Sequence, residues 1–181
     1  MAAAAIDRVR APSVPAPTEP TRRSLRVVVA AAHEGLRTAL RRRLEMEDDF
    51  ELAEDCPALD LIGDALRRCP AVLVLDLAMA RGAVVAVLGR FRADVPGTAV
   101  VALSFEDTPA FARHVLAAGA SGFVLMQRAD ADLADAVRCV ADGVRYTSPP
   151  LATKLAARGG RFAVAPEPRG PRHGASLRGG C

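Results

Sequence analysis

The chain has 181 residues, of which 51% are hydrophobic, and its six Phe, one Tyr and no Trp mean that any core is built mainly from aliphatic side chains. Its net charge of +3 is uneven: residues 1–24 carry +2, residues 25–148 carry −4 and residues 149–181 carry +5, so the overall basic balance is weak support for nucleic-acid binding. The cysteines show no C-x-x-C pair or zinc spacing, and no apolar run reaches the roughly 18 residues of a membrane span. We therefore expect a cytoplasmic protein with free thiols, no metal centre and no membrane contact.

The two ends of the chain differ in composition from the middle. Residues 1–24 contain four prolines and no hydrophobic periodicity, which predicts a disordered leader. Residues 25–148 carry a regular alternation and predict one folded domain. Residues 149–158 predict a short helix or linker, and residues 159–181, rich in Gly, Pro and Arg, predict a disordered basic tail.

Five strand–helix units follow one another through the middle of the chain. The first is a β-branched run at 25–30, then an amphipathic helix at 34–46 whose arginines at 41–43 are expected to form a solvated face. The later strands are expected at 50–55, 71–77, 98–104 and 122–126, and the later helices at 58–68, 82–94, 109–118 and 130–142. Pro109 suits the first turn of its helix and Gly119 its C-terminal cap. Asp130 and Asp132 lie near the start of the last helix, where acidic residues are favoured.

Several of these strands are apolar on both faces, and they alternate with helices. This pattern is typical of a parallel sheet covered by helices on both sides, which is the doubly wound α/β class. Ligands in such sheets bind at the carboxyl ends of the strands. Those ends carry residues 30–32, Asp76, Ser104 and Met126, and Asp76 is the only charge in its strand. Local hydrogen bonds to the backbone are an alternative role for both Asp76 and Ser104.

The stretches "RVVVAAAHE", "VLVLDLAM", "LSFED", "LAAGASGFVLM" and "AVRCVADGVRYTSPPLATKL" follow one another in a familiar order and spacing. Together they resemble the receiver domain of two-component response regulators, and more closely its NarL/FixJ (LuxR-type) family. The resemblance covers roughly residues 25–155, the size of one domain. It implies a flavodoxin-like, five-stranded parallel sheet with strand order 2-1-3-4-5.

The resemblance assigns roles to individual positions. Asp76 falls on the phosphoacceptor, Ser104 on the hydroxyl that contacts the phosphoryl group, and Phe123 on the aromatic switch of the fifth strand. The family uses a pair of acidic residues after the first strand to hold Mg²⁺, and those positions are Ala31 and Ala32 here.

Two further positions depart from the family pattern. Met126 stands where the family has a lysine that neutralises phosphoryl charge, and Ala80 stands where a proline usually follows the phosphoacceptor loop. His33 matches the histidine of the family's D-D-H sequence and is interpreted as structural. Alanines cannot ligate Mg²⁺, so we expect no metal, no cofactor and very slow or no phosphorylation of Asp76. The emptied pocket is expected to be small and apolar, lined by Ala31, Ala32, Ser104 and Met126.

The sequence leaves more than one function open. The first is an atypical receiver that signals through a protein partner, a second copy of itself or a small molecule in the emptied pocket. The second is a LuxR-type transcription regulator truncated or frameshifted before its helix-turn-helix, since the residues after 158 show no helical period and predict no specific DNA binding. The third is a receiver still phosphorylated on Asp76. We expect no enzymatic activity, because the strand ends offer one carboxylate, no base and no phosphate-binding glycine loop.

Overall fold

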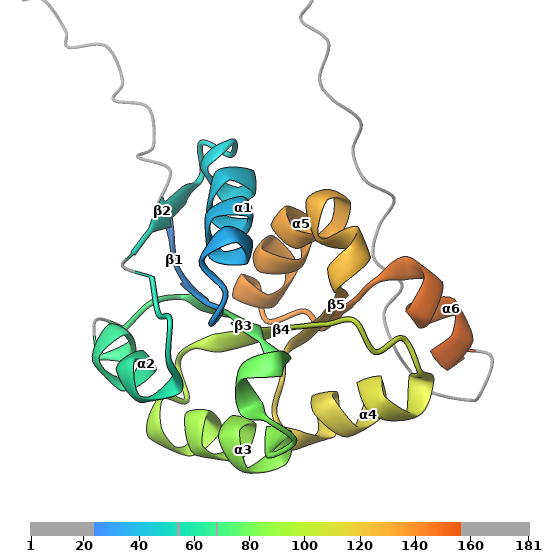
Figure 1. The fold of residues 1–181 in the computed structure, drawn as a ribbon. Coiled ribbons are helices and arrows are strands. Elements are labelled where there is room, and N and C mark those ends of the chain that lie inside the picture. The colour runs from blue at the N-terminus through green and yellow to red at the C-terminus, as the bar shows by residue number, and fades with distance from the viewer. Residues whose placement is uncertain (1–23, 54, 68, 157–181) are drawn as a thin grey trace, which may run out of the picture.

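The computed structural model describes residues 24–53, 55–67 and 69–156. Its centre is a parallel sheet whose strands lie in the order β2-β1-β3-β4-β5-β6, with helices on both faces (Figure 1). The strands are β1 (Leu25–Ala30), β2 (Phe50–Leu52), β3 (Val72–Asp76), β4 (Ala99–Ser104), β5 (Gly122–Leu125) and β6 (Tyr146–Thr147). The expected doubly wound class and the order 2-1-3-4-5 are confirmed. The sheet has one more strand than expected, because β6 adds beside β5.

Two layers of helices enclose this sheet. Helices α1 and α5 cover one face, and α2, α3 and α4 cover the other, with α6 beside α4 (Figure 1). The helices are α1 (Glu34–Glu45), α2 (Leu59–Leu66), α3 (Val84–Asp94), α4 (Pro109–Ala118), α5 (Ala129–Ala141) and α6 (Pro149–Ala156). Two short 3₁₀ turns, η1 (Leu77–Ala80) and η2 (Met126–Arg128), follow the ends of β3 and β5.

The side chains of the central strands point alternately into two separate hydrophobic cores. In β3, Val72 and Val74 pack with the residues of α1 and α5, whereas Leu73 and Leu75 pack with those of α2, α3 and α4. All four side chains are buried. Successive strand residues point to opposite faces, so a strand between two helical layers must be apolar throughout. This is why β3 and β4 could be located from composition alone.

Helix α4 begins and ends where its capping residues predict. Pro109 occupies the first turn, and the Thr108 side chain accepts a hydrogen bond from the Phe111 amide at 3.4 Å. At the other end, Gly119 has a φ of 127°, which a residue with a side chain rarely adopts. The expected span of 109–118 is confirmed.

The second strand is shorter than expected. The sequence predicts a strand over 50–55, but β2 ends at Leu52, and further along an isolated bridge joins Cys56 to Ala30. Both strands at the sheet edges are therefore short, with three residues in β2 and two in β6.

The C-terminal helix belongs to the folded body. Leu151, Ala152 and Leu155 of α6 are buried, and the two leucines join the core beneath α2, α3 and α4. The sequence predicts a short helix or linker over residues 149–158; α6 occupies Pro149–Ala156 of this range, and residues 157–158 lie outside the described residues. The predicted leader and tail lie outside the described residues, apart from Ser24. No helix in the described ranges has the length and apolar character needed to cross a bilayer.

Candidate functional site

The predicted phosphoacceptor lies at the end of β3, where it caps a turn. Asp76 is 6% exposed, and its Oδ1 atom accepts a hydrogen bond from the Ala78 amide at 3.0 Å. The bond starts the 3₁₀ turn η1, which ends at Arg81 in the left-handed region with a φ of 44°. Asp76 therefore forms a local hydrogen bond with the backbone, as its sequence position allowed. That bond occupies one of its two carboxylate oxygens.

Ser104 has a similar role on the neighbouring strand. It ends β4, and its Oγ atom accepts a hydrogen bond from the Glu106 amide at 3.0 Å. The register pairs Asp76 with Leu103, so the two candidate residues lie side by side at one edge of the sheet. The topology brings them together as the sequence predicts.

The end of β1 contributes no carboxylate to this edge. Ala31 is buried and Ala32 is exposed. The side chain of Arg37, one turn into α1, donates from Nη1 to the carbonyl oxygens of Ala31 at 2.9 Å and Ala32 at 3.3 Å. Its Nε atom lies 3.9 Å from a carboxylate oxygen of Asp55. Sequence reasoning missed Arg37, because nothing in its spacing shows that the arginine turns back toward the strand end.

The end of β5 is apolar as well. Met126 is buried in the core formed with α1 and α5. Phe123, at the aromatic switch position, is fully buried in the opposite core. Its ring meets that of Phe111 on α4 edge to face, with centroids 6.1 Å apart and an interplanar angle of 79°.

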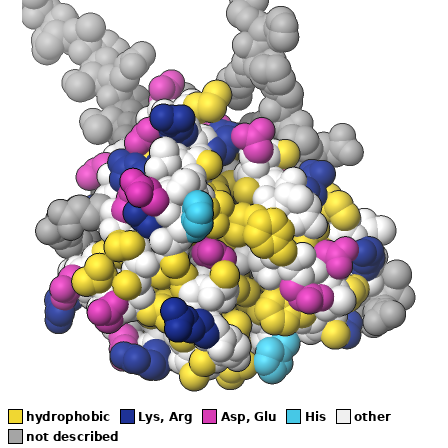
Figure 2. Space-filling model, in the orientation of Figure 1, with side chains coloured by type: hydrophobic (Ala, Val, Ile, Leu, Met, Phe, Trp, Pro, Cys, Tyr) yellow, Lys and Arg dark blue, Asp and Glu magenta, His cyan; other side chains and the backbone are white. Residues whose placement is uncertain are grey.

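A cavity opens beside Asp76 and Ser104, with a volume of about 760 Å³. Its walls come from the loops that follow β3 and β4, from the first turn of α3 and from Phe111 and His114 of α4. Ser104 lines it as expected, but Ala31, Ala32 and Met126 do not. The side chain of Met126 packs instead in the core formed with α1 and α5. Figure 2 shows hydrophobic side chains gathered in the middle of one face, with acidic side chains among them.

A buried polar cluster holds the segment after β5 in place. Asp132 is 4% exposed and binds Arg128 through two hydrogen bonds, of 2.9 and 2.8 Å. The fully buried Ser148 donates to Asp132 at 2.6 Å and accepts from the Leu125 amide at 3.0 Å. Asp132 thus ties the end of β5 to the start of α6. The sequence interpretation placed it only as an acid near the start of a helix.

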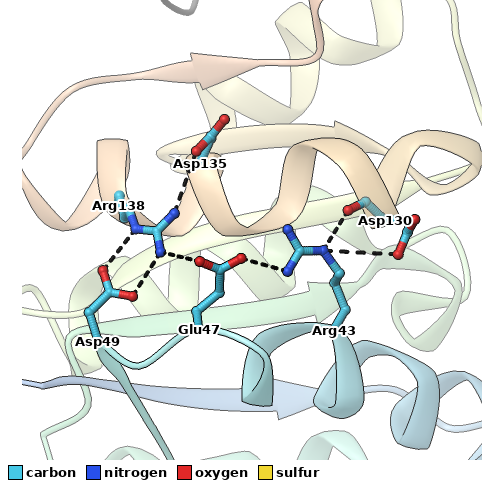
Figure 3. A network of polar contacts seen from close by, with 6 residues as sticks. All are labelled: Arg43, Glu47, Asp49, Asp130, Asp135 and Arg138. Atoms are coloured by element: carbon cyan, nitrogen blue, oxygen red, sulfur yellow. Dashed lines mark hydrogen bonds and ion pairs between the residues drawn. The ribbon is translucent and has the colours of Figure 1, made fainter. Parts of the chain in front are cut away.

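An ion-pair network joins the end of α1 to α5 (Figure 3). Arg138 of α5 bonds both Asp49, at 2.8 Å, and Glu47, at 2.5 Å, and Arg43 of α1 bonds Glu47 from the other side at 2.7 Å. The hydrogen bond from Arg138 holds the pKa of Glu47 below its ordinary value of 4.5. The same bonds, with Asp49 first, raise the pKa of Arg138.

The expected solvated face at 41–43 is therefore only partly correct. Arg42 is exposed, but Arg43 belongs to the network above and Arg41 bonds Asp55 at 2.8 Å. Glu47 lies four residues after Arg43, at helical spacing, but Asp55 and Arg138 are distant in sequence, so helical periodicity could not reveal those two partners.

The side chains at this edge do not fit a magnesium ion. Mg²⁺ requires near-octahedral oxygen ligands and is usually held by more than one carboxylate. Asp76 is the only carboxylate on the strand ends, and no group of three His, Cys, Asp or Glu in the described ranges is arranged to hold a metal.

Comparison with known proteins gives a consistent result, although no family model matches the chain. The oxygen regulatory protein NreC of Staphylococcus carnosus is 29% identical over 133 residues, covering 72% of this chain and 61% of NreC. The transcriptional regulatory protein DegU of Brevibacillus brevis is 31% identical over 136 residues, covering 72% and 56%. The solved signal receiver domain of NarL from Mycobacterium tuberculosis is 26% identical, with a TM-score of 0.61, covering 66% of this chain and 98% of that domain.

The described fold is that of a response-regulator receiver domain. Within that class it is a receiver of the NarL/LuxR family. The chain spans about three fifths of the length of the curated relatives it matches.

Proposed function

We propose that this receiver signals through contact with a partner or ligand and without phosphorylation of Asp76. The observation that carries the proposal is the chemistry of the two flanking strand ends. β1 is followed by Ala31 and Ala32, and β5 by the buried Met126, so neither end offers a carboxylate or an amine.

Phosphoryl transfer to a carboxylate depends on positioning and on neutralising the charge that develops. Removing one electrostatic partner from such a site costs on the order of 3–4 kcal/mol in the barrier. Here the acidic pair and the lysine are all replaced. In addition, the guanidinium of Arg37 bonds the carbonyl oxygens of Ala31 and Ala32, and its positive charge opposes binding of a second cation nearby. We therefore also propose that Mg²⁺ binding is lost.

The test is intact mass after incubation with Mg²⁺ and acetyl phosphate. We expect the wild-type protein to gain no phosphoryl group. A triple variant, Ala31→Asp with Ala32→Asp and Met126→Lys, restores the missing groups and is expected to gain one phosphoryl group that disappears when Asp76→Ala is added. Stoichiometric labelling of the wild-type protein that Asp76→Ala abolishes would show that Asp76 is a working phosphoacceptor and would refute the proposal.

A second candidate is the regulatory part of a longer transcription regulator. It is favoured by the likeness to DegU, a transcriptional regulatory protein of which this chain spans 56%. Reading all frames of the DNA downstream of the coding sequence tests it. An in-frame or shifted helix-turn-helix would support this candidate, and its absence would favour a receiver that acts alone or on a separate protein.

A further inference from the structure

The cavity beside Asp76 has the dimensions of a small-molecule site. Its volume of about 760 Å³ lies within the range of about 300–1,000 Å³ that is typical of ligand pockets. It lies at the carboxyl ends of β3 and β4, which is where doubly wound sheets bind ligands.

Most of the cavity wall is apolar. Leu77, Val84 and Phe111 contribute side chains from three different segments. Two further wall residues remain open to solvent: Phe105 is 74% exposed and Val85 is 47% exposed. An aromatic ring and a valine left exposed at the mouth of a cavity are available to cover an apolar body.

The titratable side chains of the wall are the carboxylates of Asp76 and Glu106 and the exposed imidazole of His114. Asp76 is more than nine-tenths buried yet lines the cavity, and Glu106 lies at the exposed rim. Only Oδ1 of Asp76 is engaged, by the Ala78 amide, and within the described ranges the other oxygen has no hydrogen-bond partner. No lysine or arginine lines the cavity. The other oxygen is open to the cavity, and the free oxygen of a mostly buried carboxylate favours a ligand that donates a hydrogen bond, and more strongly one that also carries positive charge.

We propose that this cavity binds a small amphipathic cation, an aromatic or aliphatic body that carries a protonated amine. The amine meets the free oxygen of Asp76, and the apolar body lies against Phe105, Val85 and Phe111. The inference rests on the proposed function, because a phosphorylated Asp76 would not be free for this contact. Phe111 also packs against Phe123, so the ligand would touch the immediate neighbour of the aromatic switch position.

Three probes with the same ring test the charge preference: naphthylmethylamine, naphthylmethanol and naphthoate. The chain has no Trp and one Tyr, so naphthyl fluorescence anisotropy can be read with little protein background. We expect the amine to bind about tenfold more tightly than the alcohol, as for a charge-assisted hydrogen bond, and the carboxylate not to bind.

Matched variants assign the contact. Asp76→Asn keeps the size and the capping oxygen, and it should weaken amine binding about tenfold while leaving the alcohol unchanged. Phe105→Ala should weaken both. Asp142→Asn, an exposed acid on the far end of α5, is the control and should change neither.

Equal binding of the amine and the alcohol, no binding of either, or an Asp76→Asn variant that binds the amine like the wild-type protein would overturn the inference. The titrations contain no Mg²⁺ and no phosphoryl donor, so their outcome does not depend on whether Asp76 can be phosphorylated. Amine-selective binding together with labelling by acetyl phosphate would refute the proposed function alone.

Discussion

Asp132 shows how a single buried carboxylate can organise the end of a strand. A buried charge is costly unless it is paired and hydrogen-bonded, and Asp132 has both kinds of partner in Arg128 and Ser148. The cluster follows directly after Met126. The end of β5 thus has no amine of its own, and the neighbouring guanidinium of Arg128 is engaged by Asp132.

Replacing Ser148 by alanine should lower the free energy of unfolding by about 2 kcal/mol, because Oδ2 of the buried Asp132 loses one of its two donors and the Leu125 amide loses its acceptor. Urea unfolding followed by circular dichroism measures the change. Thr153→Ala is the matched control: its hydroxyl bonds the Pro149 carbonyl at an exposed position and should change stability by less than about 0.5 kcal/mol. Equal changes in the free energy of unfolding for the two variants would show that the buried cluster of Asp132, Arg128 and Ser148 adds nothing to stability.

At the scale of elements, Arg138 fastens α5 to the segment between α1 and β2. It bonds Glu47 and Asp49, and its guanidinium carbon lies 4.9 Å from the centroid of the Phe50 ring. Ion-pair networks of this kind contribute more to stability than isolated surface pairs, because the side-chain entropy of the shared arginine is lost only once. We expect this network to fix how α1 packs against α5.

Glu47 should make the stability of the domain dependent on pH. Its pKa is lowered in the folded protein, chiefly by the hydrogen bond from Arg138, so its contribution is present above its ordinary pKa of 4.5 and is lost as the pH falls through the lower folded value. We expect Glu47→Gln to cost about 1 kcal/mol at neutral pH, and the difference from the wild-type protein to shrink below about pH 4.5. Urea unfolding across a pH series measures it. Two curves that stay parallel into the acid range would contradict the role given to Glu47.

At the scale of the whole molecule, the sheet could be predicted wherever strands are apolar on both faces. This condition holds for most of β1, β3, β4 and β5. The bounds of α4 were predicted correctly because Pro109 and Gly119 mark its ends. β6 could not be predicted, because a two-residue strand has no periodicity and depends on pairing of Thr147 with Phe123.

The candidate site could be predicted in part for a similar reason. Topology places Asp76 and Ser104 together, since parallel neighbouring strands end at the same edge. A pocket at this edge could be expected, but most of the cavity wall could not be predicted, because it depends on two loops and on which way Phe105 turns. The bonds of Arg37 likewise depend on the bend of the chain after β1.

The packing of α6 predicts where the domain can be shortened. A chain that ends after residue 156 should unfold with the stability of the full chain, because Leu151 and Leu155 keep their places in the core. A chain that ends after Ser148 loses both leucines, at about 2–5 kcal/mol each, and should unfold at far lower urea or fail to fold. Circular dichroism of the two shortened chains measures the difference. Equal stability would show that α6 is a linker.

The short edge strands limit how other proteins can bind this domain. A long open edge offers unpaired amides and carbonyls that can template another strand, and natural sheets suppress this by keeping edge strands short. Here β2 has three residues and β6 has two, and α6 follows β6 after a single residue. The domain is therefore poorly suited to β-strand addition or to fibril growth through its sheet. A protein partner must recognise side chains on the helices and on the loops at the strand ends.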